Sequence, residues 1–118
     1  MKYPELNREK LRILPLSERK NKVIIAESYV AKDADANELG EHGSKVMDNL
    51  LARISEAKKN DKPVILAFGA HSIKNGLGPV LIDLMERGYL NHLATNGAGV
   101  IHDWEFAFQG QSSEDVKE

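Results

Sequence analysis

A turn of small residues followed by two proton-active side chains is the part of the sequence best suited to chemistry. Residues 94–103 read Ala-Thr-Asn-Gly-Ala-Gly-Val-Ile-His-Asp and follow an apolar run. If a strand ends at Thr95 and a helix then begins, backbone N–H groups are left without partners at the helix start. These groups and the helix dipole favour a phosphate. His102 and Asp103, with Glu105 nearby, are the candidate catalytic residues because they can exchange protons.

A second loop with polar side chains is expected at the same place. Residues 64–68 are uninterruptedly apolar, Gly69 follows, and His71 lies in the next loop. His71 could orient a ligand or could satisfy loop carbonyls, and the residues leave both open. Together the two loops form the candidate cofactor site, which consists of His71, Ser72, Asn75, Thr95, Asn96, Gly97, Ala98 and Gly99.

The glycines of the turn do not complete a standard dinucleotide fingerprint. Gly97 and Gly99 begin the pattern, but His102 occupies the position of its third glycine. One alternative for this segment is therefore a tight strand-to-helix turn that holds no ligand. For His102 and Asp103 the alternative is an ordinary place in the first turns of a helix, where the dipole favours an acidic side chain. No metal site is predicted, because no pair of histidines has ligand spacing on one helix face.

The elements that must position these loops alternate between helix and strand. From the apolar spacing we predict helices over 44–60, 77–87 and 100–108, and strands over 64–68 and 89–95. The start of the second helix is ambiguous, because either Ser72 or Pro79 could set it. Strand, helix and strand with short links form a βαβ unit. The carboxyl ends of its parallel strands share one edge of the sheet, so both loops should converge there.

The fold class predicted from this pattern is α/β, with a Rossmann-like parallel sheet and flanking helices. Residues 1–43 are predicted to form an N-terminal arm with one candidate strand over 23–30, and residues 44–118 the nucleotide-binding core. Two strands make a thin sheet that covers its faces poorly. The sequence therefore predicts either a fragment of a larger subunit or a homo-oligomer that completes the core.

Composition limits the classes of partner. The chain has 118 residues, 42% of them hydrophobic, a formal net charge of −2 and no cysteine. Nucleic acids and acidic membranes require basic surfaces, so we expect neither as a partner. Without cysteine there are no disulfides, thiolate metal sites or thiol nucleophiles. The N-terminus lacks the apolar centre of a signal peptide, so we expect a cytoplasmic protein.

Residues 69–103 resemble the NAD-binding segment of deoxyhypusine synthase. That family has a loop, a helix started by glycine, a short strand and a Thr-Thr-Ala-Gly-Gly-Val-type turn followed by acidic residues. The resemblance covers about a third of the chain, with no motif matched in full. It implies a divergent member of this family or an N-terminal piece of one, an NAD-binding Rossmann-like fold, NAD as cofactor, and homo-oligomers with sites near subunit interfaces.

Carried over by position, the resemblance places His71 in a loop near the cofactor. It also places residues 95–98 in the turn that touches NAD. Two departures bear on activity. The two acidic residues that hold the family's polyamine substrate fall on Ile101 and His102, which removes the counter-charge for a cationic amine. The family's catalytic lysine has no counterpart in this chain.

The sequence thus leaves three functional hypotheses. The first is a deoxyhypusine-synthase-like protein of undefined reaction that binds NAD or a related nucleotide, with an NAD-dependent transferase-like activity on a non-polyamine small molecule. The second is a binding or assembly module without catalysis. The third is a transferase or hydrolase that acts on a phosphorylated small molecule through His71 and His102.

Overall fold

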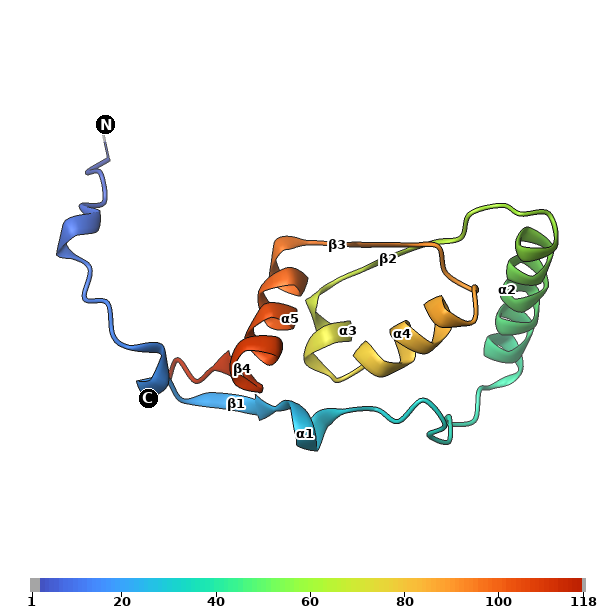
Figure 1. The fold of residues 1–118 in the computed structure, drawn as a ribbon, viewed down its shortest axis with the longest axis horizontal. Helices are drawn as coiled ribbons and strands as arrows, with labels where there is room; N and C mark the ends of the chain where they lie inside the picture. Colours follow the sequence, from blue (N-terminus) through green and yellow to red (C-terminus); the bar gives the residue numbers. More distant parts are fainter. Residues whose placement is uncertain (1–2, 118) are drawn as a thin grey trace.

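The computed structural model describes residues 3–117 and contains two separate two-stranded sheets (Figure 1). Two short 3-10 turns, Arg8–Lys10 and Leu16–Glu18, lie in the extended N-terminal segment. The remaining elements in chain order are β1 Asn21–Ile24, α1 Ile25–Ser28, α2 Glu41–Lys59, β2 Ile65–Phe68, α3 Ala70–Lys74, α4 Gly78–Glu86, β3 His92–Thr95, α5 Gly97–Gln109 and β4 Gln111–Glu114.

The predicted βαβ unit is present. Strands β2 and β3 are parallel, with Ile65 opposite His92 and Phe68 opposite Thr95. The predicted helix between them is divided in two. Gly76 separates α3 from α4 with a φ of 81°, a conformation that glycine adopts without strain. The start at Pro79 is confirmed, since it lies in the first turn of α4, whereas Ser72 does not cap a helix and lies inside α3.

The prediction of a Rossmann-like parallel sheet with flanking helices is wrong. The parallel sheet has two strands, and the second sheet pairs β1 with β4 in antiparallel fashion. After β3 the chain enters α5, and Gly110, with a φ of 69°, ends that helix. The turn sends residues 111–114 back against β1, so no third parallel strand is added. The polar sequence of β4, Gln-Ser-Ser-Glu, gave no strand signal.

The first part of the chain is joined to the rest by this second sheet. Val23 lies opposite Ser112, and Ile25 donates its backbone N–H to the Gly110 carbonyl. The candidate strand over 23–30 is only partly right, because the chain leaves the strand at Ile24 and forms the short helix α1. The division at residue 43 stays a prediction.

The long helix α2 stands apart from the other elements at one end of the molecule (Figure 1). It begins three residues before the predicted start, and Asn60 ends it by donating to carbonyls of the last turn. At that end, the Lys58 ammonium lies 4.3 Å from the centre of the Tyr89 ring and donates to the Arg87 carbonyl. These contacts hold the end of α2 near the end of α4.

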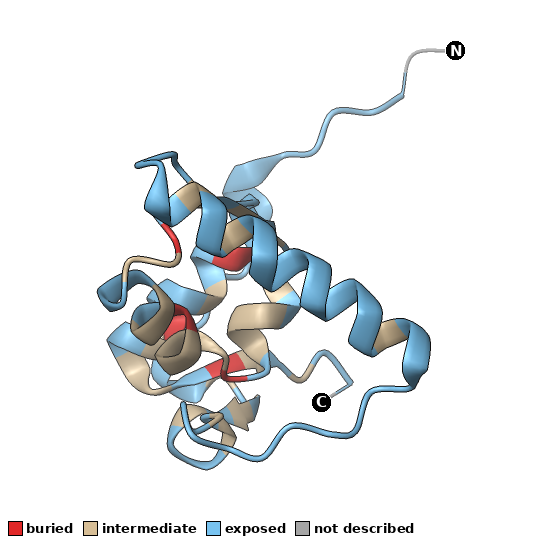
Figure 2. Ribbon diagram, turned by 90° about the vertical axis from the view of Figure 1, so that its right-hand side faces the viewer, coloured by how far each residue is buried: buried red, intermediate tan, exposed pale blue. Residues whose placement is uncertain are grey.

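Little of the described chain is buried (Figure 2). Among residues 3–117, Leu81 and Leu90 are the buried large hydrophobic side chains. Helices α3 and α4 lie on one side of the parallel sheet (Figure 1), whereas Ile65 on its other face is 62% exposed. Within the described residues, no helix is long and apolar enough to cross a membrane.

Candidate functional site

The strand-to-helix turn after β3 has the geometry expected from its residues. Asn96 is the N-cap of α5, and its side-chain oxygen accepts the Gly99 N–H at 3.0 Å. Gly97 and Ala98 are exposed and occupy the first two helical positions, whose N–H groups have no carbonyl within the helix to bind. Gly99 is buried, and a Cβ there would lie 2.2 Å from the Thr95 hydroxyl oxygen. The turn therefore requires glycine at 99 and presents amides at 97 and 98.

The second loop lies beside this turn, as the parallel strands require. A Cβ on Gly69 would be 3.9 Å from the Asn96 side-chain nitrogen, so the two loops meet at one edge of the β2–β3 sheet. His71 and Asn75 are exposed on and just after α3, and Ser72 is half-buried. The backbone carbonyl of His71 accepts the Asn75 N–H. The prediction of convergence is confirmed, while the role of each side chain in binding stays a prediction.

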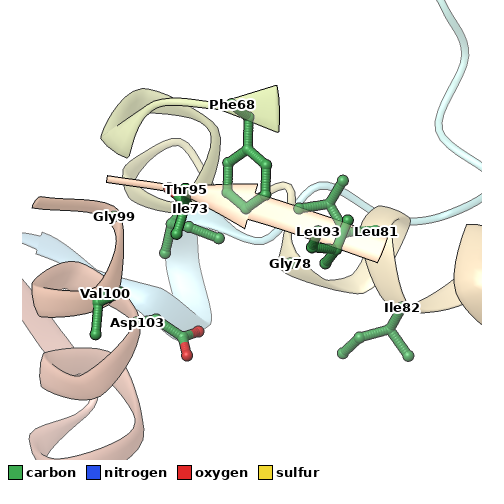
Figure 3. Close-up of a pocket in the computed structure, with 10 residues that line it drawn as sticks. All are labelled: Phe68, Ile73, Gly78, Leu81, Ile82, Leu93, Thr95, Gly99, Val100 and Asp103. Carbon is green, nitrogen blue, oxygen red and sulfur yellow. The ribbon is translucent and has the colours of Figure 1, made fainter. Parts of the chain in front are cut away.

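A cavity of about 270 Å³ lies at this edge, between the sheet and the helices (Figure 3). Its walls are mostly apolar. Its apolar side chains come from both strands and from three helices, and they are Phe68, Ile73, Leu81, Ile82, Leu93 and Val100. Thr95 and Asp103 supply a hydroxyl and a carboxylate. Such a hollow, apolar with a few polar groups, is typical of a small-ligand site.

His102 does not line the cavity. It lies on the side of α5 that contacts β4, where it belongs to a polar cluster. Its Nδ1 is 2.5 Å from the Oγ of Ser112, which is fully buried. The Ser112 hydroxyl donates to Oε2 of Glu105 at 2.5 Å, and Arg19 donates to Oε1 of the same carboxylate at 2.6 Å. Four side chains from three elements or segments, Arg19 being far in sequence from the other three, therefore form one hydrogen-bonded network.

This chain of hydrogen bonds determines which ring nitrogen of His102 carries a proton. The Ser112 hydroxyl has one proton, which it donates in the hydrogen bond to Glu105. Its oxygen can therefore only accept from His102, so Nδ1 of His102 carries a proton and donates it to this hydrogen bond. In the neutral ring, Nε2 is then the acceptor. His102 is 20% exposed, so this arrangement can hold an oriented proton acceptor near the surface of α5.

Glu105 is held in its charged form. Burial raises its pKa, but the hydrogen bonds from Arg19 and Ser112, the charge of Arg19 and, where the ring is protonated, the charge of His102 together bring the pKa below its ordinary value of 4.5. A buried carboxylate with a cation and a hydroxyl as donors is stable as the anion. The charged carboxylate therefore fixes the Ser112 hydroxyl by accepting its hydrogen bond, and Ser112 in turn orients the His102 ring.

The sequence and the structure agree only in part on the site. The structure brings the 69–75 and 95–99 loops together and places Asp103 at the cavity. His102 instead faces Ser112 and Glu105 and does not line that cavity. Arg19 and Ser112 were missed, because they lie in polar stretches that carry no motif. The spacing of three between His102 and Glu105 was the one local signal.

Comparisons with known proteins do not assign the chain to a family. No protein-family model, curated protein or solved structure matches it.

Proposed function

We propose that this protein binds a nucleotide, with NAD the preferred candidate, at the carboxyl edge of the β2–β3 sheet. The observation that carries the proposal is the juxtaposition of an apolar cavity with the exposed first turn of α5. A nucleotide combines a flat apolar ring with a phosphate, and this edge offers a complement to each. The resemblance of residues 69–103 to an NAD-binding segment favours NAD within this class.

The phosphate would be held by the start of α5. The amides of Gly97 and Ala98 are at the positive end of a helix of 13 residues, where an anion is favoured. Neither residue has a side chain large enough to block the approach, and a Cβ on Gly97 would find no atom within 4 Å. The site therefore admits a phosphate close to the backbone.

The ring and the ribose would lie on the cavity side of the turn. A volume of about 270 Å³ is at the lower limit of ligand pockets, so it suits one ring, and the rest of a dinucleotide would lie along the open edge. Thr95 and Asp103 border the cavity and could accept hydrogen bonds from ribose hydroxyls. Asp103 is thus better suited to ligand binding than to proton transfer.

NAD, when bound, supplies a hydride acceptor. The residues at the cavity and the start of α5 would bind and orient it, whereas His102 faces Ser112 on another side of α5 and does not line the cavity. The transferase-like reaction and the module without catalysis share this binding step. Binding is therefore the property to test first.

The test is calorimetric titration of the purified chain with NAD, with ADP and with inorganic phosphate. Two variants at one position isolate the backbone amide. Gly97→Pro removes the N–H at the first helical position, where proline is well tolerated, and Gly97→Ala keeps it. We expect saturable NAD binding that Gly97→Pro weakens about tenfold relative to Gly97→Ala, as for a hydrogen bond to a charged group.

A second pair of measurements tests the loops. We expect the double variant His71→Ala, Thr95→Ala to bind NAD more weakly than His42→Ala, whose side chain is exposed on α2 away from this edge. Absence of NAD and ADP binding by a folded chain would overturn the proposal. Binding of phosphate alone would favour the hypothesis of a phosphorylated small-molecule substrate instead.

A further inference from the structure

The described chain exposes far more surface than a compact monomer. Its accessible surface is 10,032 Å² and its radius of gyration 19.4 Å. A compact monomer of 13.1 kDa exposes about 6,400 Å² and has a radius of gyration of about 13 Å. The excess of about 3,600 Å² per chain is larger than the about 1,000–2,500 Å² that each partner of a permanent interface buries, so one such interface would cover part of it. Association with a further protein surface would therefore cover apolar area that the chain leaves in water.

One uncovered apolar surface is on α2. Val46, Met47, Leu50 and Leu51 are between 41% and 54% exposed and lie on one side of the helix. This side continues through Ile54, which is half-buried. Single exposed hydrophobic residues are normal, but a continuous stripe on a helix marks an interaction surface.

The side of α2 that carries the stripe has the spacing of a helix–helix seam, with Val46 and Leu51 flanking the seam positions. Five positions follow intervals of four, three, four and three residues, and they are Gly43, Met47, Leu50, Ile54 and Ala57. This interval places apolar residues at the a and d positions of a coiled coil. The partner that this geometry fits is another helix with the same interval, and α2 of a second copy supplies one.

The charges on α2 set the relative direction of the two helices. The first half has a net charge of −1 and the second half a net charge of +2, counting Glu41, Lys45 and Asp48 in the first and Arg53, Glu56, Lys58 and Lys59 in the second. An antiparallel pair places the acidic half of each helix against the basic half of the other. The helix dipoles are also opposed favourably in this arrangement.

We propose that α2 pairs in antiparallel fashion with α2 of a second copy, about a two-fold axis that passes near Leu50. Leu50 is the central residue of Glu41–Lys59, so the symmetry brings each Leu50 to its own counterpart. The pair forms independently of nucleotide binding, because α2 contributes no residue to the cavity at the β2–β3 edge.

The first test is molar mass in solution by light scattering. We expect the chain to be a dimer with twice the mass of 13.1 kDa. Leu50→Glu places a charge in the seam and should weaken association at least about a hundredfold. The matched control is Ala52→Glu, which adds the same charge on the opposite side of α2. A folded monomeric chain, or equal masses for the two glutamate variants, would overturn the proposal.

The second test defines direction and does not place a charge in the seam. The chain has no cysteine, so a single introduced cysteine reacts alone with a short bis-maleimide. We expect Leu50→Cys to cross-link into dimers. Glu41→Cys should not, because the two residues would be about 27 Å apart at opposite ends of an antiparallel pair. Cross-linking of Glu41→Cys but not of Leu50→Cys would overturn the antiparallel arrangement.

Discussion

Replacing Glu105 by glutamine tests whether the cluster of Arg19, Glu105, Ser112 and His102 holds the two ends of the described chain together. Glu105 lies on α5, Arg19 precedes β1 and Ser112 lies on β4, so the carboxylate joins three elements. Glutamine has the same shape but only one acceptor oxygen and no charge. If that oxygen continues to accept from Arg19, the amide nitrogen faces the Ser112 hydroxyl and must donate to it.

The magnitude follows from the geometry. Glu105 accepts hydrogen bonds of 2.6 Å from Arg19 and 2.5 Å from Ser112, and bonds to a charged group each contribute about 1.5–3 kcal/mol. Removing one member of a fully buried pair costs about 3–5 kcal/mol, and the 19% exposure of the Arg19 side chain lowers that figure. Since glutamine keeps the Arg19 bond without its negative charge and reverses the Ser112 bond, we expect Glu105→Gln to lower the free energy of unfolding by about 2–3 kcal/mol at neutral pH.

The pH dependence has a definite sign. The pKa of Glu105 in the folded chain is below its ordinary value of 4.5 because of Arg19 and Ser112. The stabilisation it provides is fully present above pH 4.5 and is lost as the pH falls through the lower folded pKa. The difference in stability between the parent chain and Glu105→Gln should therefore shrink in acid, because a protonated glutamate resembles glutamine.

The assay is urea unfolding of both proteins at neutral pH and at several acidic pH values. Glu86→Gln, which changes an exposed carboxylate on α4, is the control and should alter stability little. A second readout is the ¹⁵N shift of His102. In Glu105→Gln, Ser112 should donate to Nδ1 and leave the proton on Nε2. A loss below about 0.5 kcal/mol, or a difference that does not change in acid, would refute the reasoning.

Two further predictions concern the turn before α5. Gly99→Ala should destabilise the chain by about 1–3 kcal/mol, because its Cβ would lie 2.2 Å from the Thr95 hydroxyl oxygen. Gly97→Ala has open space and should be harmless by thermal unfolding, and equal melting temperatures for the two variants would contradict the crowding at Gly99. Asn96→Ala removes the N-cap bond to Gly99 and should cost about 1 kcal/mol, whereas Asn96→Asp should retain stability. Denaturant midpoints that do not separate alanine from aspartate at position 96 would argue against capping.

Local patterns in the sequence determined the elements of the parallel unit. The apolar run before Gly69 predicted β2, and the periodicity after Ser44 predicted α2, because one strand or one helix face can be read from neighbouring residues. The helix predicted over 100–108 is also present, but it begins earlier, at Gly97, because the Asn96 side chain caps it. The meeting of the 69–75 and 95–99 loops followed from the parallel connection.

Tertiary structure decided what these patterns did not contain. The strand β4 has a polar sequence and exists through pairing with β1, nearly 90 residues away in the chain. The orientation of the His102 side chain depends on the same pairing, because the β1–β4 pairing brings Ser112 of β4 into contact with α5. Long-range pairing is set by the energy of the whole chain and leaves no local period, so sequence reasoning extended the parallel sheet where the chain turns back at Gly110.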